Sequence, residues 1–356
     1  CHRVHLRSTA RPSRSLPDCD RLRFHAIAVP EYPLFEHAPY DLAVAGRVVD
    51  VVRQHRLDVV QVHYAVPHAA SAFLARQVLG SEAPRFVTSL HGTDVTGIGA
   101  DPAYREVNAF AIAASDGVSA PSEFLRREAH ARLGLQASVD IEVIPNFVDT
   151  ARFAPPARRE RARLARLFPD ADESGPVLFH VSNFRPVKRV GDLLEVLRRL
   201  RRGVAARLVL VGDGPERAAT EQQARLMGLE GAVAFLGRRS DFVDYLQQAD
   251  AFLLPSATES FGVAALEAMS CGVPVFGYAV GGLPELVGEG AGRLVPAYDV
   301  DALAAAVDAV VQDDAQQRRM AGAARALAVA RFEREPALDH YERWFRRIVS
   351  TAGEAR

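Results

Sequence analysis

The feature that most constrains the fold is a regular alternation of short apolar, strand-like runs with segments of helical periodicity. Such alternation is typical of parallel sheets whose faces are covered by helices. In the first half of the chain the expected strands are 3–6, 24–29, 59–63, 86–90, 117–120 and 141–144. In the second half they are 177–181, 207–211, 233–236, 251–254, 273–276 and 292–295. Helices are expected between them, for example over 41–55 and 67–79.

The length and one irregular segment predict the division into domains. A chain of 356 residues is long enough for two or three domains. The predicted parts are an N-terminal Rossmann-like domain (1–150), a linker rich in Pro and Arg (151–175), a C-terminal Rossmann-like domain (176–333) and a helix (334–356) packing back on the first domain. The fold class is therefore α/β, with two doubly wound parallel-sheet domains expected to face each other across a cleft, because such sheets bind ligands at the carboxyl ends of their strands.

The composition excludes several classes of protein. Hydrophobic residues make up 49% and charged residues 24% of the chain, which is a globular composition, and the net charge of −1 gives no basic excess for binding nucleic acid. The cysteines Cys1, Cys19 and Cys271 are far apart, so neither a disulfide framework nor a metal cluster is indicated, and we expect a reducing cytoplasm. No segment qualifies as a membrane span. The chain lacks a starting Met, and we expect it to begin in mid-fold.

Lys188 is the only lysine among the 43 Lys and Arg residues. A compact ammonium kept where arginine is otherwise used indicates a point charge in a confined site, although chance is the alternative explanation. Arg185 and Lys188 follow the expected strand 177–181, near a helix start. Cations at that edge of the sheet could clamp a diphosphate, and the alternative is an ordinary basic loop.

The strongest local signal is the segment 259–267, directly after the expected strand 251–254. If Ser260 caps a helix there, the free N–H groups of the first turn offer an anion site, and Gly262 keeps the approach open. Glu259 and Glu267 are too far apart along such a helix for the carboxylate pair of a glycosidase, but they could accept hydrogen bonds from two parts of one polyhydroxy ligand. The alternative is an ordinary strand, loop and helix with solvated glutamates.

Glycine-rich turns follow two further strands. Gly212 and Gly214 come after the strand 207–211, and the pair 281–282 opens another helix. Neither turn matches the pattern G-x-G-x-x-G, which removes the main support for a nicotinamide dehydrogenase.

Histidine-rich segments end two strands of the first half. The segments 63–68 and 91–94 both lie at expected carboxyl ends. Metal binding by His63, His68 and His91 stays open as an alternative, although their spacing matches no zinc motif.

Together, these motifs resemble glycosyltransferase family 4, a family of retaining enzymes with the GT-B fold, over essentially the whole chain. The segment 259–267, Lys188 and the glycine loops match the family's donor site. The segments 32–35, 39–43, 63–69, 91–96 and 182–185 are similar, in combination, to the subfamily that acts in bacterial bacillithiol biosynthesis. The chain departs from the family pattern at its start, where residues 2–5 align with the family's second strand. The first strand, Gly-rich loop and first helix are therefore expected to be missing.

The resemblance implies transfer of N-acetylglucosamine from UDP-N-acetylglucosamine to the hydroxyl of L-malate, with retained configuration and with no cofactor or metal. It implies these donor-side roles: Glu267 for the ribose, Glu259 for the sugar, Lys188 and Arg185 for the diphosphate, and Asn183, Gly212, Gly214, Ser260, Phe261 and Gly262 beside them. It implies that His91 contacts the sugar near the reacting carbon, and that Tyr64, Thr88, Asn183 and Arg185 bind malate.

Other functions stay open from the sequence. One is a family 4 transferase with another acceptor, such as an inositol phosphate or a lipid-linked sugar. Another is a GT-B epimerase or a non-catalytic protein that binds sugar nucleotides. The expected partners are the two small substrates, without nucleic acid or membrane, and the oligomeric state is left open.

Overall fold

The computed structural model describes residues 2–9, 19–31, 33–34, 36–159, 164, 166–168, 175–288 and 290–350. The chain divides into two compact units. Unit 1 comprises 1–120, 126–143 and 343–356, and unit 2 comprises 121–125 and 144–342. Cys1, Tyr32, Phe35 and parts of the predicted linker lie outside the described residues. The domain boundaries at 150, 175 and 333 stay predictions.

Unit 1 contains two parallel sheets. The strands β1 (Val4–Ser8) and β2 (Leu22–Ala26) form a two-stranded sheet. A four-stranded sheet has the order β3 (Val59–His63), β4 (Arg85–Ser89), β5 (Gly117–Ala120) and β6 (Ile141–Val143). The helices of this half of the chain are α1 (Tyr40–His55), α2 (Ala65–Leu79), η1 (Gly80–Glu82), α3 (Thr93–Thr96), η2 (Ile98–Ala100), α4 (Arg105–Ala113) and α5 (Glu123–Leu133).

Unit 2 is built on one six-stranded parallel sheet with the order β12-β11-β10-β7-β8-β9. Its strands are β7 (Val177–Ser182), β8 (Arg207–Gly212), β9 (Val233–Gly237), β10 (Ala251–Leu254), β11 (Val275–Tyr278) and β12 (Gly292–Val295). Its helices are η3 (Pro186–Lys188), α7 (Val190–Leu200), α8 (Arg217–Leu226), η4 (Glu230–Ala232), α9 (Phe242–Leu246), α10 (Val263–Ser270), α11 (Leu283–Leu286), α12 (Val300–Val311), α13 (Asp314–Phe332) and the start of α14 (Arg334–Ser350).

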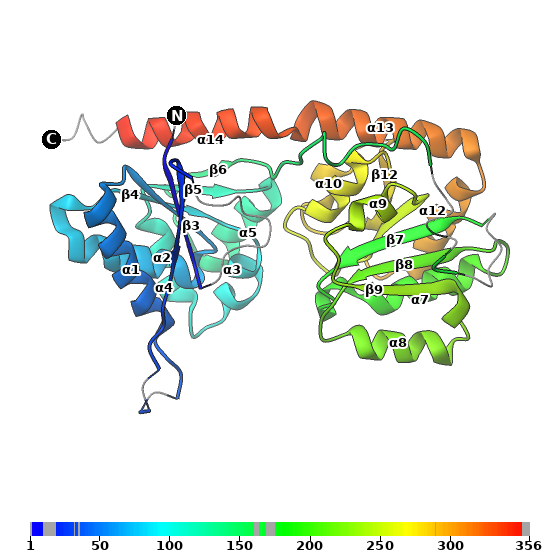
Figure 1. The fold of residues 1–356 in the computed structure, drawn as a ribbon, viewed down its shortest axis with the longest axis horizontal. Helices are drawn as coiled ribbons and strands as arrows, with labels where there is room; N and C mark the ends of the chain where they lie inside the picture. The colour runs from blue at the N-terminus through cyan, green and yellow to red at the C-terminus, as the bar shows by residue number, and fades with distance from the viewer. Residues whose placement is uncertain are drawn as a thin grey trace. The chain divides into compact units, whose positions relative to one another are not determined.

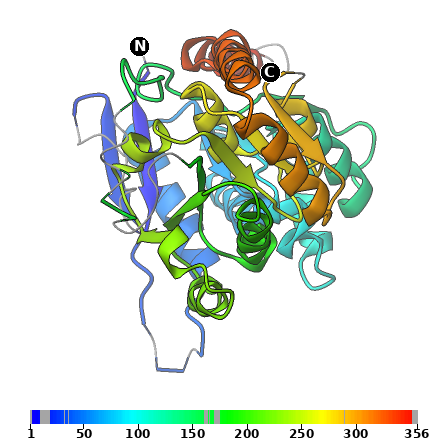
Figure 2. The same cartoon turned by 90° about the vertical axis from the view of Figure 1, so that its right-hand side faces the viewer.

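The unit 2 sheet is buried on both faces because successive apolar residues of each strand point to opposite sides. In β7, Phe179 packs with α9, α10 and α13, whereas Leu178 packs with α7 and α12. Figure 1 shows helices above and below this sheet, and Figure 2 shows the same layers from the side. Because β7 and β10 are neighbours and the chain winds outward from both, the strand order reverses between them. In sheets of this kind ligands bind where the order reverses.

The C-terminal part of α14 packs within unit 1. Trp344 and Ile348 are buried there, and a Cβ added to Gly117 would lie 2.5 Å from Ile348 Cδ1. Gly117 thus leaves room for the apolar stripe of this helix. No helix in the described part of the chain is long and apolar enough to cross a bilayer.

The predicted α/β class with parallel sheets in two units is confirmed. Some strand bounds differ: the strands expected at 24–29 and 273–276 lie at Leu22–Ala26 and Val275–Tyr278. Among the described strands, β1 and β2 form a sheet separate from the four-stranded one. Period alone cannot reveal which strands become neighbours, because that depends on non-local pairing.

Candidate donor and acceptor sites

An ion pair lies at the point where the strand order of unit 2 reverses. Lys188 ends η3, which follows β7, and Glu259 lies in the loop after β10. Lys188 Nζ lies 2.5 Å from Glu259 Oε1, and the Ser256 hydroxyl donates to the same oxygen at 2.8 Å. The two charged side chains are 22% and 10% exposed, so both are largely shielded from water. The structure therefore brings together the lone lysine and the first glutamate of the predicted donor site.

Backbone hydrogen bonds fix the loops that carry this pair. Ala257 N–H donates to Val187 O at 2.8 Å, which ties the loop after β10 to η3. Gly282 N–H donates to Glu259 O at 2.8 Å, which ties the same loop to the one after β11. These backbone hydrogen bonds consequently hold the segments that carry Lys188 and Glu259 in place at the edge of the sheet.

Two glycines allow these loops to approach so closely. Gly281 has φ +60°, and a Cβ there would lie 1.9 Å from Glu259 O. Gly212 has φ +121°, and a Cβ there would lie 1.7 Å from Ser182 O. Gly214 is close-packed too, against Asn183 O. Any side chain at these positions would push apart the loops after neighbouring strands.

The expectation that Ser260 caps the following helix is wrong. Helix α10 begins at Val263, and its N-cap is Gly262 with φ +98°. The positive φ turns the chain into the helix only after Gly262, so Ser260 lies too early to cap it. Its carbonyl instead accepts from the Ser122 hydroxyl at 2.6 Å. Phe261 is buried with its ring edge-on to Phe332.

The first turn of α10 still offers free N–H groups for an anion. No side chain caps this helix, and the first N–H groups of any α-helix have no partner within it. The donors begin at Val263, directly after the close-packed Gly262. The anion site suggested by the sequence is therefore retained, with its start moved along the chain from Ser260.

Glu267 lies on α10 and is only 8% exposed. Burial and, secondarily, the negative charge of Glu267 raise the pKa of Cys271 to about 12. Cys271 is therefore a neutral thiol, whereas Glu267 supplies a shielded negative charge. Such a carboxylate suits ligand hydroxyls that donate hydrogen bonds.

Arg185 and Asn183 are exposed in the loop after β7. No ion pair or side-chain hydrogen bond joins Arg185 to another residue within the described ranges. Phe184 between them has φ +41° and a fully buried ring, so this ring anchors the loop.

His180 is a site residue that the sequence interpretation missed. Its Nδ1 lies 2.8 Å from Leu253 O and its Nε2 lies 2.8 Å from Ser182 Oγ, which in turn accepts from Phe184 N–H. Burial, followed by the nearby Lys188 charge, lowers the pKa of His180 to about 4. The neutral ring thus links β10 to the start of the Arg185 loop. A histidine inside an apolar strand pattern was the available signal.

In unit 1 a second group forms at the ends of β3 and β4. His63 Nδ1 lies 2.8 Å from His91 Nε2, and the Tyr64 and His91 rings lie 4.5 Å apart. The buried Asp94 carboxylate accepts from the N–H groups of Ala65, His91 and Gly92 at 2.7–3.3 Å. Asp94, which the sequence interpretation did not single out, therefore fixes both histidine-bearing loops.

The two imidazoles of this group, His63 and His91, have lowered pKa values, which favours their neutral forms. Loss of hydration, followed by the electrostatic effect of His91 and His68, lowers the pKa of His63 to about 4. Part of the residue is nevertheless exposed. Burial also lowers the pKa of His91, and Asp94 partly opposes this shift. His91 is consequently suited to hydrogen bonding rather than to supplying a positive charge.

Two predicted participants lie differently. Thr88 is fully buried within β4, and its hydroxyl lies 2.7 Å from Ser115 Oγ, so it does not belong to the surface group of His91 and Tyr64. His68 Nδ1 contacts the His63 carbonyl at 2.7 Å. Among the described residues, His63, His68 and His91 do not form a cluster with metal-ligand spacing.

Comparison with known proteins matches both halves of the chain. Residues 1–152 match the profile described as Glycosyltransferase Family 4, and residues 166–327 match the one described as Glycosyl transferases group 1. The N-acetyl-alpha-D-glucosaminyl L-malate synthase of Bacillus anthracis is 36% identical over 96% of this chain and 88% of its own length.

Two further proteins are similar over most of the chain. A GDP-mannose-dependent alpha-(1-6)-phosphatidylinositol monomannoside mannosyltransferase of Mycolicibacterium smegmatis is 32% identical over 80% of this chain and 75% of its own length. The crystal structure of HepE from Anabaena in complex with UDP and glucose superposes with a TM-score of 0.72 at 22% identity, covering 94% of this chain and 85% of that chain. The fold is therefore that of GT-B proteins.

Proposed function

Because the chain belongs to glycosyltransferase family 4, we propose that it transfers N-acetylglucosamine from UDP-N-acetylglucosamine to the hydroxyl of L-malate, with retained anomeric configuration, as the first step of bacillithiol biosynthesis. The observation that carries the donor half is the Lys188–Glu259 pair where the strand order of unit 2 reverses. The likeness to the Bacillus anthracis enzyme over 96% of the chain supports the sugar and the acceptor.

In the proposed binding of the donor, Lys188 and Glu259 exchange each other for groups of the nucleotide sugar. A diphosphate entering at the start of α10 meets the N–H groups of its first turn together with Lys188 and Arg185. Lys188 then pairs with the diphosphate, which frees Glu259 to accept hydrogen bonds from hydroxyls of the donor sugar. Glu267 takes the ribose hydroxyls, and Asn183, Gly212 and Gly214 line the same edge.

The chemical step needs no nucleophile from the protein. The malate hydroxyl oxygen bonds to the anomeric carbon while the bond from that carbon to the UDP oxygen breaks. A leaving phosphate oxygen takes the malate proton on the same face, which gives retention. Fixed cations and helix N–H groups stabilise the charge that develops on UDP, and such preorganised electrostatics usually supplies the largest catalytic contribution. We propose that no metal or cofactor takes part.

The acceptor-side roles are proposed for His91 and Tyr64 of unit 1 and for Arg185 and Asn183 of unit 2. His91 is a neutral ring fixed by His63 and by the Asp94 loop, so it can hydrogen-bond a sugar hydroxyl without competing for the diphosphate. Tyr64, whose ring is tilted against that of His91, is proposed to contact malate. The exposed Arg185 guanidinium and the Asn183 amide are proposed to reach the malate carboxylates. Thr88, which is buried, is proposed only to support β4.

The decisive experiment incubates the full-length protein with UDP-N-acetylglucosamine, UDP-glucose and GDP-mannose, each with L-malate, other hydroxy acids or inositol phosphate. Product masses identify the donor and the acceptor, and the anomeric coupling in the NMR spectrum identifies the configuration. We expect an α-linked N-acetylglucosaminyl malate from the first donor alone.

Other products would assign another function. Mannosyl products from GDP-mannose would favour the activity named for the Mycolicibacterium smegmatis relative. Conversion of the donor without an acceptor would indicate an epimerase. Nucleotide binding without turnover of any pair would indicate a non-catalytic binding protein.

A further inference from the structure

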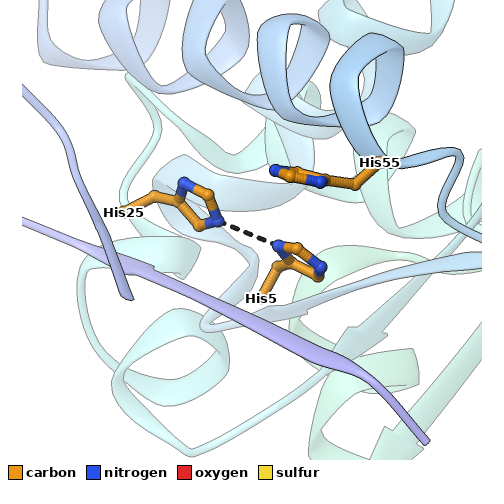
Figure 3. A group of neighbouring side chains, drawn as sticks. All are labelled: His5, His25 and His55. Atoms are coloured by element: carbon orange, nitrogen blue, oxygen red, sulfur yellow. Dashed lines mark hydrogen bonds between the residues drawn. The ribbon is translucent and has the colours of Figure 1, made fainter. Parts of the chain in front are cut away.

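Three histidines from separate elements of unit 1 converge on one point, away from the His63–His91 group. They are His5 on β1, His25 on β2 and His55 in the last turn of α1. Figure 3 shows the three rings grouped together, with the dashed line joining His5 and His25. The residues lie 20 and 30 positions apart in sequence, so no short motif announces the group.

The pairing of β1 with β2 explains how two of the rings meet. The strands are parallel, with His5 opposite Arg23 and Arg7 opposite His25. His5 and His25 are therefore on the same face of the ladder, displaced by two residues, which is within reach of ring side chains. The third ring comes from the end of α1, where the left-handed Arg56 ends the helix directly after His55.

The ring nitrogens lie near enough to one another for small movements to bring them to the spacing of metal ligands. His5 Nδ1 lies 2.9 Å from His25 Nε2, and one nitrogen from each of the three rings lies within 4.8 Å of the other two. Ligands about 2.05 Å from a tetrahedral ion lie about 3.3 Å from one another. Small rotations of the rings would therefore give an ion three nitrogen ligands. In the part of the chain that the structure describes, this is the group of three His, Cys, Asp or Glu side chains whose ligand atoms all lie within 4.8 Å of one another.

The chemistry favours a divalent transition metal. Neutral imidazole suits Zn²⁺, Cu²⁺, Ni²⁺ and Co²⁺, whereas Mg²⁺ and Ca²⁺ prefer oxygen ligands. All three residues are half-buried, so water can take a fourth position. The proton in the His5–His25 hydrogen bond has to move to the other nitrogen of its ring when the ion binds, which each neutral imidazole allows.

We propose that His5, His25 and His55 bind one divalent transition-metal ion that ties the two-stranded sheet of unit 1 to α1. An ion held by β1, β2 and α1 at once cross-links three elements that are separate in sequence. The ion is structural, and the inference does not depend on the proposed sugar transfer.

The test uses the full-length protein freed of metal by a chelator. Zn²⁺ is titrated in competition with a chromogenic chelator, and Co²⁺ is titrated while its visible d–d bands are recorded. The variants are His5→Asn, His25→Asn and His55→Asn. The matched control is His37→Asn, because His37 is an exposed histidine of the same unit outside the group.

We expect one Zn²⁺ per chain and a tetrahedral Co²⁺ spectrum for the wild type and for His37→Asn. Each of the three variants should weaken Zn²⁺ binding about tenfold or more, because loss of even an outer-shell partner of a metal ligand costs about that much in other proteins. Absence of stoichiometric binding, or equal affinity of all variants, would overturn the proposal and leave the rings as a packed histidine cluster.

A measurement on the wild type alone covers the case in which a variant fails to fold. X-ray absorption at the zinc edge counts the imidazole ligands directly. Three imidazoles and an oxygen are expected. A sulfur ligand, or fewer than three imidazoles, would place the ion elsewhere and contradict the assignment.

Discussion

Lys188 Nζ and Glu259 Oε1 lie 2.5 Å apart although 71 residues separate them, and each belongs to a loop at the carboxyl end of a central strand of unit 2. The ion pair balances the charge of the only lysine of the chain. Because both groups are largely shielded from water, either one left alone would be costly. A diphosphate that takes Lys188 and a sugar that takes Glu259 would satisfy both at once.

Replacement of Lys188 tests this exchange through catalysis. Lys188→Ala should lower kcat/KM for the proposed transfer about 100-fold or more, as loss of one preorganised donor does in other enzymes. Lys188→Arg should also be impaired, because the planar guanidinium does not fit a site shaped for a compact ammonium. The exposed Arg225 of α8 gives the control Arg225→Ala, which should be unchanged. Near-normal rates for Lys188→Ala would return the lysine to an ordinary loop.

Glu267→Gln should weaken UDP binding about tenfold or more, since the carboxylate would lose charge-assisted hydrogen bonds to the ribose. The side chain is 8% exposed, and Gln preserves its volume, so the fold should persist. Calorimetric titration with UDP measures the effect, with the exposed Glu230→Gln as the control. An unchanged affinity would remove Glu267 from the ribose contact.

Gly281→Ala should disturb the donor site through the backbone. The residue has φ +60°, and its new Cβ would lie 1.9 Å from Glu259 O, so either the loop shifts or the chain is strained by about 1–3 kcal/mol. A lower urea midpoint and weaker UDP binding are expected. Gly231→Ala is the matched control, because nothing lies within 4 Å of a Cβ there. Equal behaviour of the two variants would show that the close approach to Glu259 is unimportant.

His180 makes stability depend on pH. Its pKa falls from 6.5 to about 4 on folding, so between these values the unfolded chain binds a proton that the folded chain does not. The free energy of unfolding should therefore drop as pH falls below 6.5, by about 1.4 kcal/mol per pH unit from this group. Urea midpoints at pH 7 and pH 5 measure the drop.

His180→Asn should be less stable than the wild type at pH 7, because two hydrogen bonds are disturbed, but its stability should fall less steeply toward pH 5. Parallel curves for the two proteins would show that folding leaves the pKa of His180 unchanged, which would contradict this prediction.

Particular residues show what the sequence could predict. Strands β7, β8 and β10 were recognisable because apolar side chains on both faces leave little ambiguity, and their ends then placed Lys188, Gly212 and Glu259 at one edge. The sequence predicts the start of α10 too early, because Ser260 belongs to the residue types preferred at N-caps. In the structure Gly262, with φ +98°, is the N-cap instead.

Contacts between distant residues were beyond prediction. His180 and Asp94 act through hydrogen bonds to backbone groups 73 and 29 residues away, and His5, His25 and His55 meet only once β1, β2 and α1 are assembled. Such groups depend on tertiary packing, which neither periodicity nor local spacing encodes.

The most direct measurement compares the affinities of UDP and uridine for the wild type and Lys188→Ala by calorimetry. If Lys188 binds the diphosphate, the wild type should prefer UDP to uridine, and Lys188→Ala should reduce this preference about tenfold or more while leaving uridine binding unchanged. The same preference for UDP in both proteins would contradict the assignment of Lys188 to the diphosphate.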